Sequence, residues 1–181
     1  MKKIAIILVI ALFFGLSSDT SAQGKTRKEK KRERQEKIEQ QYQFTKEVLK
    51  GQKFVLEADY LQNKYGTRVP VSSIINFIKV DSGEAVLQIG NPFGRGYNGV
   101  GGVTAEGRIT SYKMDENDKN NTFDINMSIL SSLGNYDIFM NIGADGYASA
   151  TLTGLRGGKL IYSGEIVHNL KSGIYKGSTS Y

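Results

Sequence analysis

The chain has 181 residues, the length of one domain, and it contains no cysteine and one histidine. This composition excludes disulfides, thiolate-bound zinc or iron–sulfur clusters and histidine-rich metal sites. The net charge of +6 comes largely from one segment: residues 24–50 hold ten Lys or Arg against five Glu, whereas residues 51–181 hold twelve of each sign. The basic pI therefore gives no evidence that the main domain binds nucleic acid, and we expect no nucleic-acid partner.

Residues 1–22 have the features of a cleavable secretory signal peptide. Two lysines precede an apolar run from Ile4 to Leu16, and the small residues of Thr20-Ser21-Ala22 suit a cleavage site. The run has 13 residues, fewer than the roughly 20 that a membrane-spanning helix needs. A buried core helix is the less favoured alternative. We expect an exported, periplasmic protein that is not a lipoprotein, because no Cys follows the cleavage site.

Residues 23–50 predict a basic N-terminal helix, since no proline or glycine interrupts residues 25–50. The first half of this helix, up to Arg34, has no apolar face. In the second half, apolar residues recur at helical spacing. We expect the second half to dock on the body of the protein and the first half to stand in solvent. The docking positions are Ile38, Tyr42, Thr45 and Leu49.

The basic half of this helix has three interpretations. The first is an ordinary solvated helix. The second is a contact with an anionic envelope surface, such as lipid headgroups or an acidic polymer, through clustered cations. The third is nucleic acid, which export makes an unsuitable partner. The cations proposed to contact an anionic surface are Lys28, Lys31, Arg32 and Arg34.

From Lys53 onward the hydrophobic period changes from 3.6 to 2, which is typical of strands with one buried and one wet face. Short turn signals and a polar loop at Asp115–Asn121 separate the runs. About eight short strands over residues 51–181 predict an all-β domain, an antiparallel meander that closes into a barrel. The clear runs are Phe54–Tyr60, Phe123–Ile129 and Tyr136–Ile142, and the weaker ones are Ile74–Val80, Ala85–Ile89, Val103–Tyr112, Tyr147–Thr153 and Leu160–Ile166.

Two motifs resemble ligand sites without meeting their structural requirements. Gly94–Gly99 matches the glycine spacing of a dinucleotide loop, but it continues into a loop and a strand instead of opening a helix. Asp115, Asn117 and Lys119 occupy the first positions of a calcium-loop pattern, yet Lys119 stands where an oxygen ligand is needed. We therefore predict no cofactor and no metal site.

No group of residues points to an enzyme. His168 is the one histidine available for a hydrolase triad, and a surface histidine is the better interpretation. Glu57 and Asp59 lie two apart on one strand face and are expected to point into water. We predict no catalytic residues and a non-enzymatic protein.

The segment Gly90–Gly102 is the best candidate for a binding site, because six of its thirteen residues are glycine. Phe93, Arg95 and Tyr97 alternate with glycines there and offer stacking surfaces and a planar cation for an anionic or aromatic ligand. The structural alternative is a bulged connection in which the two aromatic rings plug one end of the barrel and Arg95 bonds carbonyls. That alternative is favoured over a site.

The stretch from Phe93 to Ile166 resembles a family of exported Bacteroidota proteins catalogued as domain of unknown function 4251. The resemblance rests on Phe93-Gly94-Arg95-Gly96-Tyr97, on Gly101-Gly102-Val103 followed by Gly107, and on Ile161-Tyr162-Ser163-Gly164-Glu165-Ile166. It implies a lipocalin-like barrel and a periplasmic location. It implies no activity.

These features lead to three hypotheses for function. The leading one is an exported, non-enzymatic β-barrel that binds a small anionic or apolar ligand or a partner. The second is an envelope-surface protein that acts through its basic helix. The third is a small outer-membrane barrel, in which alternating apolar side chains would face lipid and the terminal aromatic Tyr181 would fit the pattern.

Overall fold

The computed structural model describes residues 26–91, 98–155 and 158–180. The chain forms two compact units, residues 1–34 and residues 35–181. The described elements are one helix, α2 (Arg27–Lys50), and the strands β1 (Lys53–Asn63), β2 (Arg68–Pro70), β3 (Phe77–Asp81), β4 (Glu84–Ile89), β5 (Val103–Asn117), β6 (Thr122–Ser131), β7 (Gly134–Ile142), β8 (Tyr147–Leu155) and β9 (Gly158–His168).

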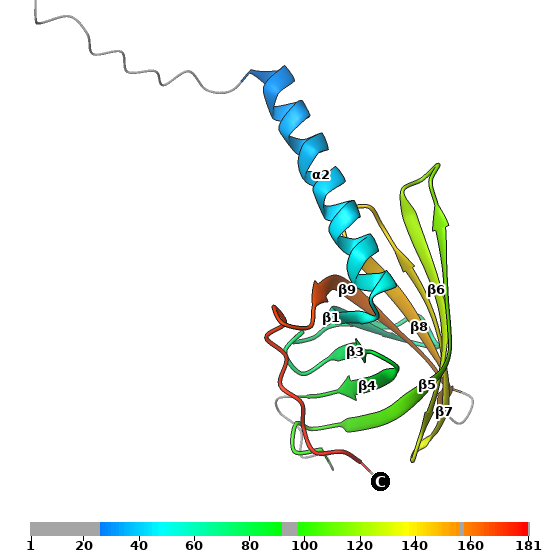
Figure 1. The fold of residues 1–181 in the computed structure, drawn as a ribbon. Coiled ribbons are helices and arrows are strands. Elements are labelled where there is room, and N and C mark those ends of the chain that lie inside the picture. The colour runs from blue at the N-terminus through cyan, green and yellow to red at the C-terminus, as the bar shows by residue number, and fades with distance from the viewer. Residues whose placement is uncertain (1–25, 92–97, 156–157, 181) are drawn as a thin grey trace, which may run out of the picture. The chain divides into compact units, whose positions relative to one another are not determined.

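Eight of the strands close into an antiparallel barrel, which confirms the predicted fold class (Figure 1). The order β1-β3-β4-β5-β6-β7-β8-β9 follows the sequence, and β9 then pairs with β1 from Phe54↔His168 to Asn63↔Leu160. Closure leaves these strands without open edges along their paired lengths. The additional strand β2 pairs only with the far end of β1, beyond the point where β3 stops.

Three local features of the strands differ from the sequence-based expectations. The segment predicted as the polar loop Asp115–Asn121 is shorter, because β5 continues to Asn117. The short strand β2 was not predicted. A bulge between Ala58 and Tyr60 shifts the alternation of β1, so that Leu61 is buried in place of Tyr60. Opposite this bulge stands Gly164, where a Cβ would collide with the carbonyl oxygen of Glu57.

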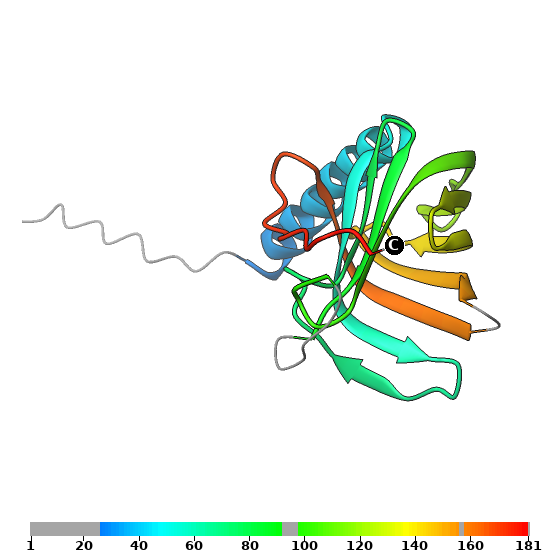
Figure 2. The same ribbon diagram turned by 90° about the horizontal axis from the view of Figure 1, so that it is seen from below.

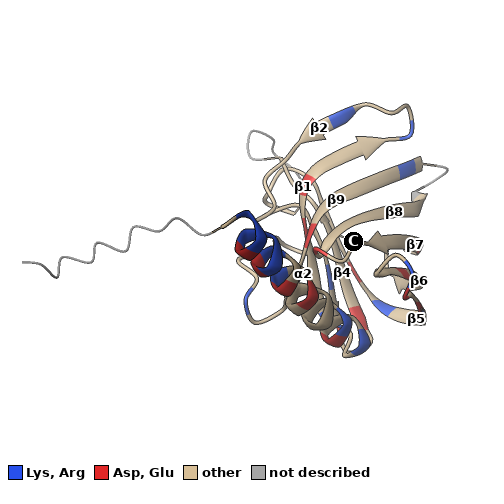
Figure 3. Ribbon diagram, turned by 90° about the horizontal axis from the view of Figure 1, so that it is seen from above, with Lys and Arg blue, Asp and Glu red and all other residues tan. Residues whose placement is uncertain are grey.

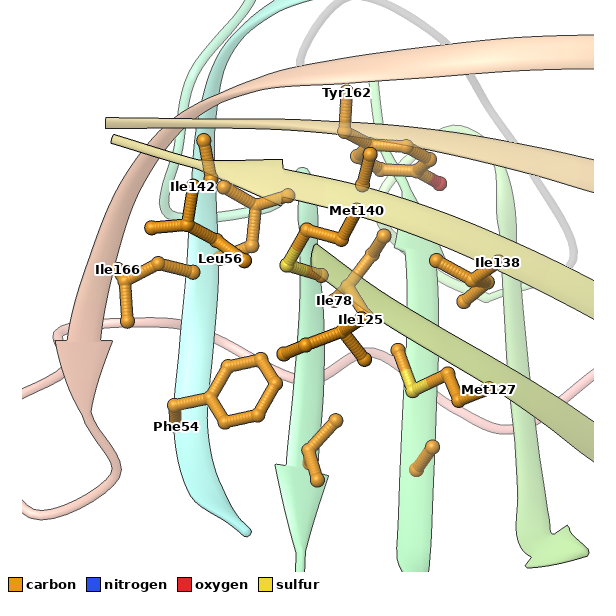
Figure 4. Packing of buried hydrophobic residues seen from close by; sticks show 14 of the residues in the cluster. Phe54, Leu56, Ile78, Ile125, Met127, Ile138, Met140, Ile142, Tyr162 and Ile166 are labelled. Atoms are coloured by element: carbon orange, nitrogen blue, oxygen red, sulfur yellow. The ribbon is translucent and has the colours of Figure 1, made fainter. Parts of the chain in front are cut away.

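The inward-facing side chains of the barrel strands form one continuous hydrophobic core (Figure 4). Burial of this apolar surface is the main stabilising contribution in a domain that has no disulfides. The labelled core side chains in Figure 4 are Phe54, Leu56, Ile78, Ile125, Met127, Ile138, Met140, Ile142, Tyr162 and Ile166.

The helix α2 begins with a capping box that the sequence analysis overlooked. The backbone N–H of Thr26 donates to Glu29 Oε2 at 2.8 Å, and the N–H of Glu29 donates to Thr26 Oγ1 at 3.3 Å. No helix in the described ranges is both long and apolar enough to cross a membrane.

The second half of α2 docks on the barrel as predicted, with Tyr42, Thr45, Val48 and Leu49 buried. The ring of Tyr42 stacks on Phe123 at 4.8 Å between centroids. The expectation for Ile38 was wrong, because its side chain is 36% exposed. The contact face of the helix therefore begins one turn later than the apolar pattern indicated.

The outer face of β1, β3, β4 and β5 is covered by the segment 169–180, which follows β9 and has no regular secondary structure (Figure 1, red). Outward positions on these strands form the cross-strand row Glu57–Phe77–Gln88–Thr104. The tail binds three of the four: Ser172 donates to Glu57, Gly177 N–H to Gln88 and Ser180 N–H to the Thr104 carbonyl. Phe77, the fourth member, is completely buried although it points away from the barrel interior.

Candidate functional site

The three tentative ligand-binding residues Phe93, Arg95 and Tyr97 lie outside the described residues, so their positions are not tested. Their described neighbours are Asn91, which follows β4, and Asn98, which precedes the turn leading to β5. The proposed site is therefore framed by residues whose contacts are known.

Asn98 anchors the far end of this segment through four hydrogen bonds, and its side chain is 1% exposed. Its Nδ2 donates to Thr104 Oγ1 at 3.1 Å and to the Ile89 carbonyl at 3.2 Å. Its Oδ1 accepts from the N–H groups of Val100, at 3.1 Å, and Gly102, at 2.9 Å. The amide thus uses all of its hydrogen-bonding capacity inside the protein, which fits a structural anchor better than a ligand contact.

The buried side chain of Gln88 extends this network to the C-terminal tail. Its Nε2 donates to the carbonyls of Ile75, at 3.1 Å, and Tyr175, at 2.9 Å. Its Oε1 accepts from Thr104 Oγ1 at 2.9 Å and from the N–H of Gly177 at 2.8 Å. The sequence analysis missed this residue; the signal was a lone amide within the apolar run of β4.

One pocket among inward-facing side chains at the β4–β5 end has a volume of only about 70 Å³. Pockets for small-molecule ligands usually enclose about 300–1,000 Å³. This pocket is therefore too small to give the barrel a ligand chamber of the expected kind. Its lining residues are Leu87, Ile89, Val103, Ala105, Tyr136, Leu152 and Tyr162.

A larger apolar groove of about 670 Å³ lies beside β2, where that strand separates from the main barrel. The β1–β2 hairpin that borders it projects at one side of the barrel (Figure 2). Among the described residues that line the groove none is charged, and few of their groups are polar. The described lining residues are Leu61, Val69, Pro70, Val71, Ser72, Asn76, Gly90 and Asn91, and the last two are the first residues of the glycine-rich segment.

The free edge of β2 is poorly suited to pairing with a further strand. The Thr67 carbonyl and the Val71 N–H bond to β1, which turns the backbone groups of Arg68 and Pro70 to the other side. Pro70 has no N–H to donate, and a charged residue and a proline are common protections of an edge strand. Any ligand of the groove must therefore be held by side chains.

The proposed anionic-surface contacts lie in the exposed half of α2. Lys28, Lys31 and Arg32 are spaced three and four residues apart on one face, and Arg34 follows Lys31 by three. All four residues are exposed, although Arg32 also makes a contact within the protein. Arg32 lies three residues after Glu29 and four residues before Glu36, so cations and carboxylates share this face of the helix (Figure 3).

Two acidic residues of the β5–β6 hairpin, Asp115 and Glu116, are engaged in ion pairs. Asp115 pairs with Lys113 at 2.9 Å, and Glu116 accepts from Lys46 Nζ at 2.5 Å and from the Tyr42 hydroxyl at 2.6 Å. The ammonium of Lys46 and the Tyr42 hydroxyl together hold the pKa of Glu116 below its usual range. Within the described residues no cluster of three or more His, Cys, Asp or Glu could hold a metal ion.

The fold and these surfaces define a small closed barrel domain with a docked N-terminal helix. The family model described as "Domain of unknown function (DUF4251)" matches residues 36–166, and the chain belongs to this family. It is similar to a DUF4251 family protein from Bacteroides eggerthii DSM 20697 whose crystal structure is solved. The identity is 28%, the match covers 74% of this chain and 91% of that one, and the TM-score is 0.62. No curated protein matches the chain.

Proposed function

We propose that the protein is an exported, non-enzymatic binding protein of the periplasm, and that an apolar ligand occupies the groove beside β2. The main support for this proposal is the size of the groove, because its volume of about 670 Å³ lies within the usual range for ligand sites. The signal-like N-terminus supports export. The groove also adjoins the glycine-rich segment, so Phe93, Arg95 and Tyr97 belong to the chain that continues directly from its rim.

The chemistry of the lining selects an uncharged ligand. Leu61, Val69, Pro70 and Val71 offer aliphatic surface, whereas Ser72, Asn76 and Asn91 contribute neutral polar groups. The amide of Asn76 is already occupied, since it donates to the Ser72 carbonyl and accepts from Gly90 N–H. Removal of apolar surface from water is therefore the main source of affinity that this groove provides.

A neutral fluorescent probe tests this function. N-phenyl-1-naphthylamine should bind the mature protein saturably, and Val69→Lys should weaken binding at least fivefold because it places a charge in the groove. Val69 is 46% exposed, so the variant should fold normally. The matched control is Ile74→Lys, at a position that is 52% exposed and outside the lining. Unsaturable binding, or equal weakening by both variants, would refute the groove as a ligand site.

The basic helix supports a second candidate function, attachment to an anionic envelope surface. The specific observation is that these four cations are exposed and that residues 24–50 hold ten Lys or Arg against five Glu. Each Lys or Arg near an anionic membrane contributes about 1 kcal/mol. Four such residues give a weak, reversible and salt-sensitive association, which is compatible with ligand binding by the barrel.

The third hypothesis, an outer-membrane barrel, is the least supported. Such barrels present an apolar outer band to lipid. In β6 and β7 most of the apolar side chains are instead buried inside, Leu130 and Phe139 being the exposed exceptions, and Asp124, Asn126, Asp137 and Asn141 point outward. This arrangement favours a barrel whose outer face is surrounded by water.

A further inference from the structure

The outer face of β5–β8 contains a polar hollow of about 310 Å³, and none of its described lining residues lines the groove beside β2 or makes the contacts described between α2 and the barrel. Its centre is unusual for a solvent-facing strand surface, because the large apolar side chain of Phe139 is 46% exposed there. The lining residues are Ser111, Asn126, Met127, Ser128, Asp137, Ile138, Phe139, Thr151 and Thr153.

Strand register arranges these side chains in two parallel rows. The first row crosses four strands as Ser111–Ser128–Asp137–Thr153. The second row contains Asn126, Phe139 and Thr151 and lies two residues further along each strand. Adjacent strands are about 4.8 Å apart, so the first row spans roughly 14 Å, enough for two or three sugar rings.

A bulge and short hydrogen bonds fix the first row in place. The register of β5 shifts between Ile109 and Ser111, which brings Thr110 and Ser111 to the outside together. Thr110 Oγ1 donates to the Ser128 carbonyl at 3.2 Å, and Ser128 Oγ donates to Asp137 Oδ1 at 2.7 Å. The polar groups therefore keep a defined geometry on rigid strands before any ligand arrives.

The composition of this face sets it apart from an ordinary solvated surface. The strands β6, β7 and β8 contain no Lys, Arg or Glu, and β8 is tan along its whole length in Figure 3. Their outward polar residues are short Asn, Asp, Ser and Thr side chains, which lose less conformational entropy on binding than long charged ones. On β5, Lys113 stands opposite Asn126 in the second row, but it lies outside the lining and pairs with Asp115 at 2.9 Å.

From this arrangement we propose that the hollow is a binding site for neutral carbohydrate. The face of the Phe139 ring offers a stacking surface for the apolar C–H face of a sugar. The hydroxyls of Ser111 and Thr153, the amide of Asn126 and the carboxylate of Asp137 supply both donors and acceptors for sugar hydroxyls. The charge of the described lining suits a neutral ligand, because Asp137 is the one acidic or basic residue among its described members and repels phosphates, sulfates and uronic acids.

The test uses the mature protein on an array that carries both neutral and acidic glycans. We expect binding to neutral glycans, with at least a tenfold loss of affinity in Phe139→Ala and retention in Phe139→Trp. The matched control is Leu130→Ala, which removes an apolar side chain that is 55% exposed on the outer face of β6 but outside the hollow. Val69→Lys should leave glycan binding unchanged, which separates this site from the groove beside β2.

Thermal melting establishes that each variant is folded. If Phe139→Ala does not fold, Asn126→Lys takes its place, because Asn126 is exposed and the new ammonium would project into the hollow. The proposal is overturned if no neutral glycan binds, if only acidic glycans bind, or if binding survives both substitutions. Capture of a protein partner that depends on Phe139, without glycan binding, would likewise overturn it.

Discussion

At the scale of single residues, the contact between Tyr42 and Glu116 links the helix to the β5–β6 hairpin and makes it sensitive to pH. The hydrogen bond to the Glu116 carboxylate is the main cause that raises the pKa of Tyr42 to about 12, and burial adds to it. An unfolded tyrosine titrates near 10. The stabilisation from neutral Tyr42 is therefore complete below about pH 10 and disappears as the pH rises to about 12.

Replacing this hydroxyl should have a measurable cost. Tyr42→Phe keeps the stack on Phe123 but removes the hydrogen bond to Glu116, so we expect a loss of about 1–3 kcal/mol in the free energy of unfolding at pH 7. Urea titrations at pH 7 and pH 11 measure the effect, and the difference between wild type and variant should shrink at the higher pH. Tyr65→Phe, at an exposed position, is the control. Equal stability of the two variants at pH 7 would contradict this account.

Individual residues also show which parts of the molecule the sequence could not reveal. Periodicity correctly placed Phe54, Ile125 and Ile138 inside, because each alternating run has one apolar face. It failed at Tyr60, where a bulge interrupts the period, and it gave no indication that Phe77 is buried on the outer face of the barrel. The tail residues that bind its row neighbours Glu57 and Gln88 come about 100 positions later in the chain, and no local pattern contains that information.

At the scale of elements, the helix divides into a half fixed by packing and a half defined by charge. Tyr112 reinforces the packed half by donating its hydroxyl to the Leu49 carbonyl at 2.8 Å, and burial raises the pKa of Tyr112. The charged half is anchored locally by its capping box of Thr26 and Glu29. This division makes it feasible to alter the cations of the first half without unfolding the barrel.

Neutralising those cations tests attachment to an anionic surface. The variant Lys28→Gln, Lys31→Gln, Arg32→Gln and Arg34→Gln should bind vesicles of phosphatidylglycerol and phosphatidylcholine at least tenfold more weakly than the intact mature protein. Binding by the intact protein should fall steeply between 50 and 300 mM salt, conditions chosen to shorten the screening length.

The control for this experiment removes the same number of charges from the barrel. Its substitutions are Lys53→Gln, Lys64→Gln, Lys119→Gln and Lys159→Gln, at positions that are exposed. Vesicle binding that drops equally in both variants would show that only net charge matters. Binding that persists in the helix variant would end the surface-attachment hypothesis.

The arrangement of the strands also explains why neither the groove beside β2 nor the polar hollow could be predicted from the sequence. The strands and the docked helix could be predicted from the hydrophobic period. The meander could be predicted because strands that are consecutive in sequence usually pair. The groove beside β2 arises where a three-residue strand leaves the main sheet, and three residues are too few to carry a period. The polar hollow was hidden for another reason: alternation identifies outward residues but not which of them lie opposite one another across strands.

At the scale of the whole molecule, the proposed export makes a direct prediction about processing and location. The full chain, expressed in a Gram-negative host, should lose residues 1–22 and be released by osmotic shock without detergent. Mass spectrometry of the released protein should place the new N-terminus at Gln23. Retention with a cytoplasmic marker would contradict export, and extraction only by detergent would instead favour a membrane-embedded barrel.

The tail over the barrel also determines when this protein can finish folding. The first strand, β1, pairs with the last, β9, and residues 172–180 then bind side chains or backbone of β1, β4 and β5. These contacts join the two ends of the mature chain, and such long sequence separations slow folding. A chain that is still emerging lacks both its closing strand and its outer cover, so it stays unfolded until synthesis or translocation is almost complete. In the export route proposed above, the chain would be threaded through a membrane before it folds, and this delay would then be an advantage.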